Sequence, residues 1–283
     1  MPGDAENVLL IDNPAQHVRR FTLNRPSKRN ALSNELRGAL FDALEAGDSD
    51  PDVHVMIIRG AGSCFSSGYD LAYLGPTPSH ASGGPGWWAR HVVEGCFRIW
   101  DLAKPVIAQV HGWCLAGGSE LAVACDLVYV AQDAQIGYPP VRTISPPDNH
   151  YHAWLMGMRA AMEQMLTGDA IDGLEAVRLG FANRAFAGDD LEDQVLAMAS
   201  RIARVDPELA QINKRAVHRQ MDAMGMRAGL RAGTEMQALG QTTEASREYM
   251  LKMREDVRTA LQVRDKPFED YGSDSENARD STK

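Results

Sequence analysis

The sequence lacks three features that would assign it to large classes of proteins: a long apolar run, an excess of basic residues and paired cysteines. No apolar run approaches the length that crosses a bilayer, and the start, MPGDAENVLL, lacks the basic stretch and hydrophobic core of an export signal. The formal charge is −9, from 29 basic and 38 acidic residues, so the surface would repel a nucleic-acid backbone or an anionic membrane. We therefore expect a cytoplasmic protein that binds neither nucleic acid nor membrane, in which any phosphate of a ligand meets a local basic cluster.

Cysteine is also scarce, and no two cysteines form a Cys-x-x-Cys pair. All of them lie in apolar settings, which is typical of reduced, buried thiols and not of disulfides or metal ligands; they are Cys64, Cys96, Cys114 and Cys125. His150 and His152, in NHYH, have a spacing that permits a pair of metal ligands, but no third ligand is evident. The sequence therefore predicts no metal site.

Strands and helices are predicted to alternate along the first half of the chain. Ser33 is a suitable N-cap, Leu36, Leu40 and Leu44 keep helical spacing after it, and GDSDP at 47–51 ends that helix. Strands are predicted at 8–13, 18–24, 53–60, 105–112 and 127–137, and further helices at 92–103 and 118–126. Such alternation indicates an α/β fold with a mainly parallel sheet wrapped by helices.

Two glycine-bearing turns stand out among these elements. In GSCFSSGYDL, Gly68 allows backbone conformations that let the next amide, on Tyr69, point into a pocket instead of into a ladder. In LAGGSEL, the Gly117 amide stands at the start of a helix, where free N–H groups and the helix dipole favour an anion. Each turn alone is explained as a tight turn of an α/β protein, but two amides converging on one point would form an oxyanion hole.

Taken together, the two turns and their surroundings are more specific. FSSGYDL, at 65–71, followed by KPVIAQVHGWCLAGGSELAVACDLVYVAQDAQIG, at 104–137, resembles the enoyl-CoA hydratase/isomerase, or crotonase, superfamily. The resemblance extends to TLNRPSKRNALS near the start, LTGDAIDGLEAVRLGFANRAF after the core and KPFEDY near the end. It therefore covers nearly the whole chain.

The resemblance implies a core built as a spiral of ββα turns, followed by a helical trimerisation region, with subunits assembled as a homotrimer or a dimer of trimers. The pattern of the chain is helical throughout after about residue 150, which fits this order. We therefore predict a crotonase-like spiral core with the CoA-thioester site at 1–200, a helical oligomerisation region at 201–270 and a disordered tail at 271–283.

In the family, the amides that match Tyr69 and Gly117 hold the thioester oxygen of an acyl-CoA, and so stabilise the enolate that forms on deprotonation. Glu120 stands where the hydratases carry one of two catalytic glutamates. Its position, just after two glycines in an otherwise small or apolar stretch, is that of a buried carboxylate with a structural or a chemical task. The resemblance implies the chemical one.

The resemblance also assigns a set of CoA contacts. Lys28 and Arg29 match positions near the CoA phosphates, and the turn Ser66, Ser67 and Gly68 lies near the adenine. A carboxy-terminal aromatic residue and lysine, Phe268 and Lys266, can close over the nucleotide. Basic residues are also common on any surface, so a solvated face explains each one singly. No cofactor is implied beyond coenzyme A as part of the substrate.

The chain departs from the family pattern at the second catalytic glutamate, where it has Pro140 in GYPPV. Proline cannot act as an acid or a base, so the standard two-glutamate hydration is in doubt. Asp148 stands, by ungapped count, where dienoyl-CoA isomerases carry an acid and 4-chlorobenzoyl-CoA dehalogenases a nucleophilic aspartate. It could shuttle a proton, attack the substrate, or cap a helix that begins near Tyr151. His91, His150 and His152 are further candidates for replacing the glutamate.

We therefore expect an acyl-CoA enzyme in which Glu120 is the main acid/base. Isomerisation of a double bond needs one carboxylate that removes and returns a proton, so it tolerates the loss of the partner better than hydration does. Hydrolysis or displacement through Asp148 is the enzymatic alternative, and a non-catalytic acyl-CoA-binding subunit is the other. The acyl group is not specified, because the segment 74–95 that would shape its pocket follows no recognisable pattern; Trp87 and Trp88 there could line that pocket or pack the loop.

Overall fold

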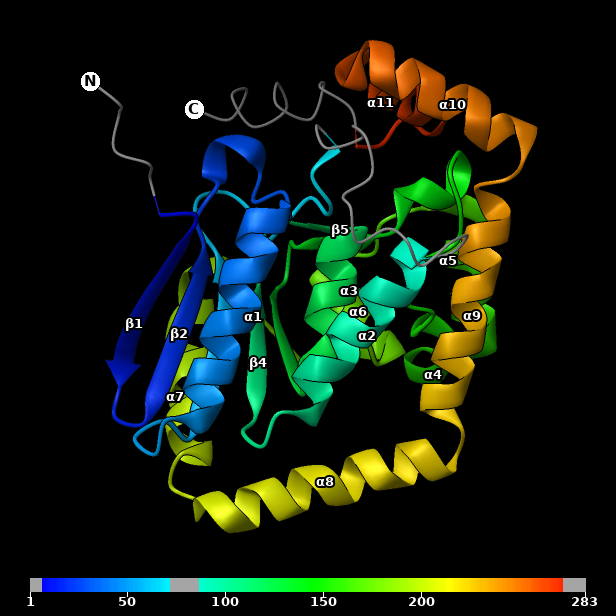
Figure 1. Ribbon diagram of the computed structural model, residues 1–283. Helices are drawn as coiled ribbons and strands as arrows, with labels where there is room; N and C mark the ends of the chain where they lie inside the picture. Colours follow the sequence, from blue (N-terminus) through cyan, green and yellow to red (C-terminus); the bar gives the residue numbers. More distant parts are fainter. Residues whose placement is uncertain (1–6, 72–86, 272–283) are drawn as a thin grey trace.

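The computed structural model of the protein describes residues 7–71 and 87–271. The predicted disordered tail lies outside the described residues except for Tyr271, and so does the first part of the segment 74–95. Figure 1 shows a sheet between layers of helices, with the last four helices following the outside of the molecule.

The main sheet has its strands in the order β1-β2-β3-β4-β6-β8. Their bounds are β1 (Leu9–Ala15), β2 (Val18–Leu23), β3 (Val55–Gly60), β4 (Val106–Val110), β6 (Leu127–Ala131) and β8 (Arg184–Phe186). β1 is antiparallel to β2, and every other pair is parallel. A second, parallel pair consists of β5 (Trp113–Leu115) and β7 (Gln135–Gly137). The expected α/β fold with a mainly parallel sheet is confirmed.

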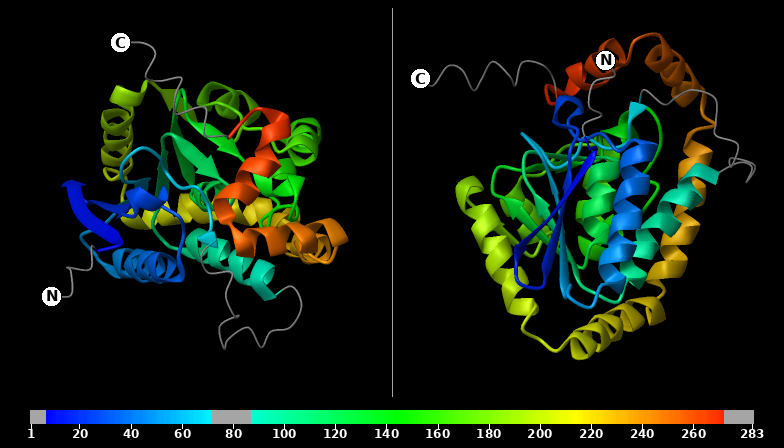
Figure 2. Two further views of the ribbon diagram at one scale, coloured as in Figure 1. Left: turned by 90° about the horizontal axis from the view of Figure 1, so that it is seen from above. Right: turned by 60° about the vertical axis from the view of Figure 1, so that its left-hand side comes forward.

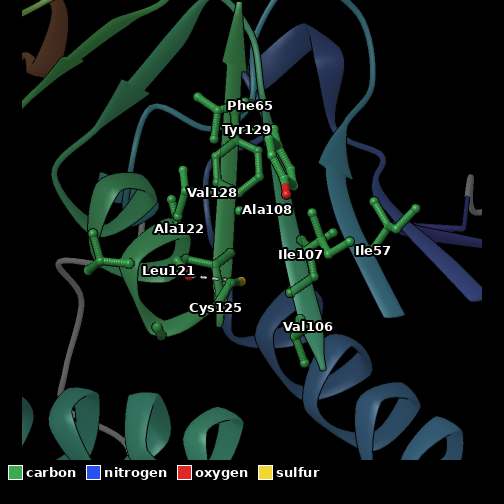
Figure 3. Close-up of a cluster of buried hydrophobic side chains, with 14 of the residues drawn as sticks. Ile57, Phe65, Val106, Ile107, Ala108, Leu121, Ala122, Cys125, Val128 and Tyr129 are labelled. Atoms are coloured by element: carbon green, nitrogen blue, oxygen red, sulfur yellow. Dashed lines mark hydrogen bonds between the residues drawn. The ribbon is translucent and has the colours of Figure 1, made fainter. Parts of the chain in front are cut away.

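Helices cover both faces of this sheet. α1 (Asn34–Ser49) and α3 (Gly117–Ala124) lie on one face, α7 (Leu191–Ile202) lies on the other, and α2 (Trp87–Asp101) packs beside α3 (Figures 1 and 2). All five residues of β4 are buried, as expected of a parallel strand with helices on both sides. Figure 3 shows the resulting core, in which side chains of β4 and β6 pack with Ala122 and Cys125.

Helix α1 forms where its sequence pattern predicts it. The Ser33 hydroxyl accepts a hydrogen bond from the Leu36 amide at 3.2 Å, which caps the first turn. Leu36, Leu40 and Leu44 are buried along one face of the helix. The predicted cap and the predicted core face are both confirmed.

The helices after β7 extend the chain around the core. They are α4 (His152–Leu155), α5 (Gly157–Thr167), α6 (Gly173–Leu179), α8 (Pro207–Ala223), α9 (Met226–Gly240), α10 (Glu244–Glu255) and α11 (Val257–Asp265). In Figure 1, α8 runs along the lower end of the molecule, α9 rises beside α2, and α10 and α11 cross the upper end. No helix in the described ranges is long and apolar enough to cross a membrane.

A buried arginine holds the carboxy-terminal segment in place. The Arg142 side chain is 2% exposed and donates to Asp169, Asp265 and Asp270 at 2.6 to 3.1 Å. Its guanidinium also lies 3.8 Å from the centre of the Phe268 ring. Asp169 precedes α8 in the sequence, whereas Asp265 ends α11 and Asp270 follows it. The ion pairs therefore tie the end of the helical segment to the core.

Three predicted elements differ from the structure. The chain is not helical throughout after residue 150, because β8 adds a strand that pairs with β6. The predicted strand 127–137 is divided into β6 and β7, which belong to different sheets. The helix predicted at 92–103 begins at Trp87, so His91 lies within α2.

Candidate active site

The two glycine turns meet at the carboxyl ends of β3 and β4. Gly68 has φ +101°, and a Cβ built on it would lie 3.1 Å from the Gly117 nitrogen and 2.9 Å from the Ala116 Cβ. Neither the Tyr69 nor the Gly117 amide donates to a backbone acceptor within the described ranges. The turns therefore approach too closely for a side chain at residue 68, and both leave an N–H group for another acceptor.

Hydrogen bonds within the first turn fix this approach. The buried Ser66 hydroxyl donates to the Asn30 carbonyl at 2.9 Å and accepts from the Gly68 amide at 3.1 Å. The Ser66 carbonyl in turn accepts from the Leu115 amide at 3.0 Å. These bonds tie the turn to the strand that leads into α3. Ser66 thus has a structural role in addition to the CoA contact that the sequence assigns to its turn.

Glu120 lies in the first turn of α3, a helix whose eight residues are all buried. Its Oε1 accepts from the Asn149 amide at 3.0 Å, and its Oε2 accepts from the Tyr69 hydroxyl at 3.1 Å. The side chain is fully buried, and burial raises the pKa of this carboxyl to about 7. Glu120 therefore keeps its proton at a higher pH than an exposed glutamate does, which is typical of a general acid or base.

Asp148 supplies a second buried carboxyl at the same place. It is 2% exposed, and its Oδ1 has no hydrogen-bond partner in the described part of the chain. Burial, followed by the nearby charge of Glu120, raises the pKa of Asp148 well above its ordinary value, although a hydrogen bond from Trp88 lowers it. Asp148 is consequently the protonated member of the pair when Glu120 is ionised.

Among the alternatives for Asp148, the helix cap is wrong. α4 begins at His152, and its N-cap residue, Tyr151, forms no side-chain capping bond. Asp148 lies four residues before that helix in a turn whose backbone wraps Glu120. The burial of its carboxyl therefore has no explanation as a helix cap.

Sequence reasoning identified the Tyr69 amide but missed the Tyr69 phenol. Burial, together with the charge of Glu120, raises the pKa of Tyr69 well above its usual value, so the hydroxyl stays protonated and donates to Glu120. Its ring also lies over the glycine turn that precedes α3, because a Cβ on Gly117 would come within 2.6 Å of it. The spacing of a turn gives no signal for a side-chain contact of this kind.

Arg37 was also missed. It comes from α1, and its guanidinium lies 5.4 Å from the centre of the Tyr69 ring and 5.1 Å from that of Trp88. The charge of Arg37 lowers the pKa of both buried carboxyls, although less than burial raises it. Its place next to the core residue Leu36, one helical turn before Leu40, is the signal that could have placed it near the sheet side of α1.

A narrow pocket opens beside this cluster, between α1, α2 and α3. Arg37, Tyr69, Cys96 and Gly117 contribute to its wall, and the rest of the lining is apolar: Leu32, Leu40, Phe41, Val92, Ile99 and Leu121. Apolar space therefore lies next to Tyr69 and Gly117, and Glu120 is reached through the Tyr69 hydroxyl. An acyl chain is the kind of group that such a wall accommodates.

His150 and His152 have no third potential metal ligand beside them in the part of the chain that the structure describes. No group of three potential metal ligands occurs within residues 7–71 and 87–271. His150 Nε2 and His152 Nδ1 are buried without a hydrogen-bond partner there, and burial lowers the pKa of His152 to about 3. His152 is thus a neutral imidazole that cannot deliver a proton near neutral pH. His91 stacks on Trp87 with 5.0 Å between ring centres.

The predicted CoA residues fall into two groups. Lys28 and Arg29 are exposed at the end of a short 3₁₀ helix, Pro26–Lys28, and the Arg29 carbonyl accepts from the Ser67 amide at 3.0 Å. The structure therefore brings the basic pair next to the Ser66–Gly68 turn. Lys266 and Phe268 lie in the segment held by Arg142, and Phe268 is 45% exposed. In the described ranges no hydrogen bond or ring contact joins the two groups.

A family model for enoyl-CoA hydratase/isomerase matches residues 14–261. The chain belongs to the enoyl-CoA hydratase/isomerase family. A relative in Escherichia coli K12, named 2,3-dehydroadipyl-CoA hydratase, is 32% identical over 245 residues, which cover 84% of this chain and 92% of the relative. The resemblance seen in the two glycine turns is thus confirmed.

Solved structures of the enoyl-CoA hydratase/isomerase family share the fold. An enoyl-CoA hydratase/isomerase from Xanthobacter autotrophicus Py2 superposes with a TM-score of 0.83 at 33% identity, covering 92% of this chain and 98% of that one. An enoyl-CoA hydratase from Mycobacterium smegmatis gives a TM-score of 0.86 at 29% identity, covering 94% and 96%. The chain therefore has the crotonase fold and is an enzyme of the family that acts on acyl-CoA.

Proposed function

We propose that the protein isomerises a double bond in an enoyl-CoA thioester, with Glu120 as the base and Asp148 as the acid. The observation that carries the proposal is the pair of buried carboxyls beside two free amides, with a pKa raised in both. Asp148 takes the place of the glutamate that the family pattern has at Pro140. The different environments of the two carboxyls divide the roles between them.

The proposed reaction moves one proton off the acyl chain and another onto it. The thioester oxygen accepts hydrogen bonds from the Tyr69 and Gly117 amides, so the enolate that forms when Glu120 removes a proton is stabilised. Asp148 then donates its proton to the carbon at the other end of the conjugated system, and the thioester carbonyl re-forms. Transfer of the proton from Glu120 to Asp148 restores the starting state.

Hydration of the same kind of substrate is the second candidate. Two carboxyls near one site can orient a water and deliver a proton to the α-carbon, which is what hydration needs. The hydratase names of the E. coli and M. smegmatis proteins favour this candidate. The small, mostly apolar pocket beside Glu120 favours isomerisation, which needs no water.

Displacement or hydrolysis through Asp148 has less support. A nucleophilic aspartate must be ionised, and burial together with the charge of Glu120 raises the pKa of Asp148. A non-catalytic binding role leaves two buried carboxyls without a task, although burying them costs stability.

The proposal includes the CoA contacts and the setting of the enzyme. Lys28 and Arg29 would meet the CoA phosphates, next to the Ser66–Gly68 turn that would take the adenine, and Lys266 and Phe268 would close over the nucleotide. Coenzyme A enters only as part of the substrate, and no other cofactor is proposed. Four unpaired cysteines support a reducing compartment, the cytoplasm.

Self-association as a homotrimer or a dimer of trimers is also part of the proposal. Met158, Met162 and Leu166 follow one face of α5 and are 70%, 53% and 76% exposed. An apolar stripe of this kind is typical of a surface that is covered by a partner. Light scattering should give a multiple of three subunits, and Met162→Lys should reduce it; a monomer would refute this part of the proposal.

Mass spectrometry with chromatography tests the reaction. The purified protein is incubated with 3-enoyl-CoA, 2-enoyl-CoA, dienoyl-CoA and aryl-CoA thioesters. A product of unchanged mass and shifted retention supports isomerisation, a gain of one water supports hydration, and free CoA supports hydrolysis. Binding without turnover of any thioester would contradict an enzymatic role.

A further inference from the structure

The Arg37 guanidinium lies against two aromatic rings, Tyr69 and Trp88, at the candidate active site. Its guanidinium lies 5.4 Å from the centre of the Tyr69 ring and 5.1 Å from the centre of the Trp88 ring. The two rings are themselves in edge contact, with their centres 5.2 Å apart and an angle of 83° between them. Cation–π contacts from two rings fix the position of the cation without neutralising its charge.

No carboxylate is in contact with this guanidinium within the described ranges. Arg20, Arg142 and Arg227 each form ion pairs with two or more carboxylates, whereas none is found for Arg37 there. The segment 72–86 contains neither aspartate nor glutamate. Glu120 and Asp148 feel the charge of Arg37 without bonding to it, and their own hydrogen bonds come from Tyr69, Trp88 and the backbone of the 148–149 turn.

The surroundings of Arg37 make an unpaired cation conspicuous. The pocket that it lines is otherwise formed by apolar side chains and by the glycine turn that precedes α3. A half-buried cation against apolar walls is costly unless an anion meets it, and the protein supplies none in contact. The missing anion is therefore expected from the ligand.

We propose that Arg37 forms a carboxylate subsite, which selects acyl-CoA substrates with a free carboxylate at the far end of a short acyl chain. The inference rests on the proposed function, because it needs an acyl-CoA bound at the Tyr69 and Gly117 amides. The chain must be short, because the Tyr69 ring lies 5.4 Å from the guanidinium at its face and donates to Glu120 through its hydroxyl. The planar fork of arginine matches a carboxylate with two parallel hydrogen bonds, and the apolar wall accommodates the methylene groups.

Two substrates of equal length test the subsite. trans-2-Hexenoyl-CoA ends in a methyl group, and the monothioester trans-2-hexenedioyl-CoA ends in a carboxylate. The wild-type kcat/KM for the carboxylate substrate should exceed that for the methyl substrate by about tenfold to hundredfold, the range of a charged hydrogen bond. Arg37→Met should bring the ratio of the two kcat/KM values to about one. Arg37→Lys should leave an intermediate ratio, since lysine keeps the charge but cannot form two parallel hydrogen bonds.

The ratio separates substrate recognition from a supporting role. If Arg37 only tunes Glu120 and Asp148, Arg37→Met lowers both kcat/KM values equally, and an unchanged ratio overturns the subsite. Arg159→Gln, which changes an exposed arginine on α5, is the matched control and should leave the ratio as in the wild type. Melting temperatures of all variants show whether a loss comes from misfolding.

Binding of two unreactive thioesters separates this inference from the proposed function. Calorimetry with hexanoyl-CoA and adipyl-CoA should give a lower Kd for adipyl-CoA that depends on Arg37. Equal affinities in the wild type would refute the subsite while leaving the acyl-CoA function intact. If neither thioester binds, the proposed function fails, and the subsite fails with it.

Discussion

At Arg142, three carboxylates surround one buried guanidinium, whereas at Glu120 and Asp148 two buried carboxyls lie together with no cation in contact in the described part of the chain. Arg142, Glu120 and Asp148 are all buried, but only the charge of Arg142 is neutralised by ion pairs. Burial raises the pKa of Glu120 and Asp148, because it outweighs the hydrogen bonds and the charge of Arg37 that lower it. The paired cluster ties the carboxy-terminal segment to the core, and in the proposed function the unpaired cluster transfers protons.

Replacing the base should produce the largest effect. Glu120→Gln keeps the shape of the side chain and removes the charge that accepts a proton, so we expect turnover to fall by about 10² to 10⁴. Affinity for an acyl-CoA should stay within a few-fold, because the thioester contacts are backbone amides. Steady-state kinetics and calorimetry measure the two quantities. Glu235→Gln, on the exposed side of α9, is the matched control, and unchanged turnover in Glu120→Gln would remove Glu120 from the mechanism.

The same chemical change in an aspartate of each cluster should have opposite results. Asp148→Asn should lower turnover by about 10² with little change in melting temperature, because it removes the carboxyl proton that the proposed reaction needs and breaks no ion pair. Asp265→Asn should lower the free energy of unfolding by about 3 kcal/mol, because it leaves Arg142 and Arg264 without a buried partner.

Both variants are tested by turnover per folded molecule and by denaturant unfolding. We expect the loss of turnover in Asp148→Asn and the loss of stability in Asp265→Asn. An Asp148→Asn protein that unfolds easily but retains turnover would give Asp148 a structural role. Glu120 would then work alone.

The pH dependence of stability should report the unpaired cluster. The pKa of Glu120 is raised from 4.5 to about 7 in the folded protein, so between these values the folded state keeps a proton that the unfolded state has released. Its contribution to stability is therefore complete below pH 4.5 and falls as the pH rises to about 7, by at most about 3 kcal/mol. Relative to the wild type, Glu120→Gln should gain stability with rising pH, as measured by urea unfolding. A constant difference would contradict the raised pKa.

The smallest effect is expected at the exposed basic pair. Replacing Lys28 and Arg29 together by alanine should weaken CoA binding about tenfold, because exposed charge contacts are modest and are screened by salt. Binding of a pantetheine thioester, which lacks the nucleotide phosphates, should hardly change. Equal losses for both ligands would mean that the pair supports the turn at Ser66–Gly68 and does not contact phosphate.

Local sequence patterns were sufficient to predict the features that depend on neighbouring residues. Ser33 caps α1 through its own helix, and the glycine at 68 is required by a positive φ and a close backbone approach. These features depend on residues a few positions apart or on the conformation of one residue. The position of Glu120 after two glycines likewise placed it in a buried helix start.

Features that depend on distant segments were not predictable in the same way. β8 has three residues, and only its pairing with β6 makes it a strand. Arg37 reaches the site because α1 packs beside α2 and α3, and the Tyr69 phenol reaches Glu120 only after the two turns have met. The sequence left a cap open as one role of Asp148, because the start of α4 could not be located to within a residue.

Helix α3, buried on every side, has a consequence for anyone who wishes to redesign the enzyme. Glu120 is mounted on an element with no free surface, so almost any alteration around it disturbs the interior. Asp148 is mounted on an irregular connection, between the short 3₁₀ turn Pro139–Arg142 and α4, where no helical or sheet ladder restricts what can be exchanged. New reactions are therefore best sought by varying residues 138–149 together while the sequence of α3 is left unchanged.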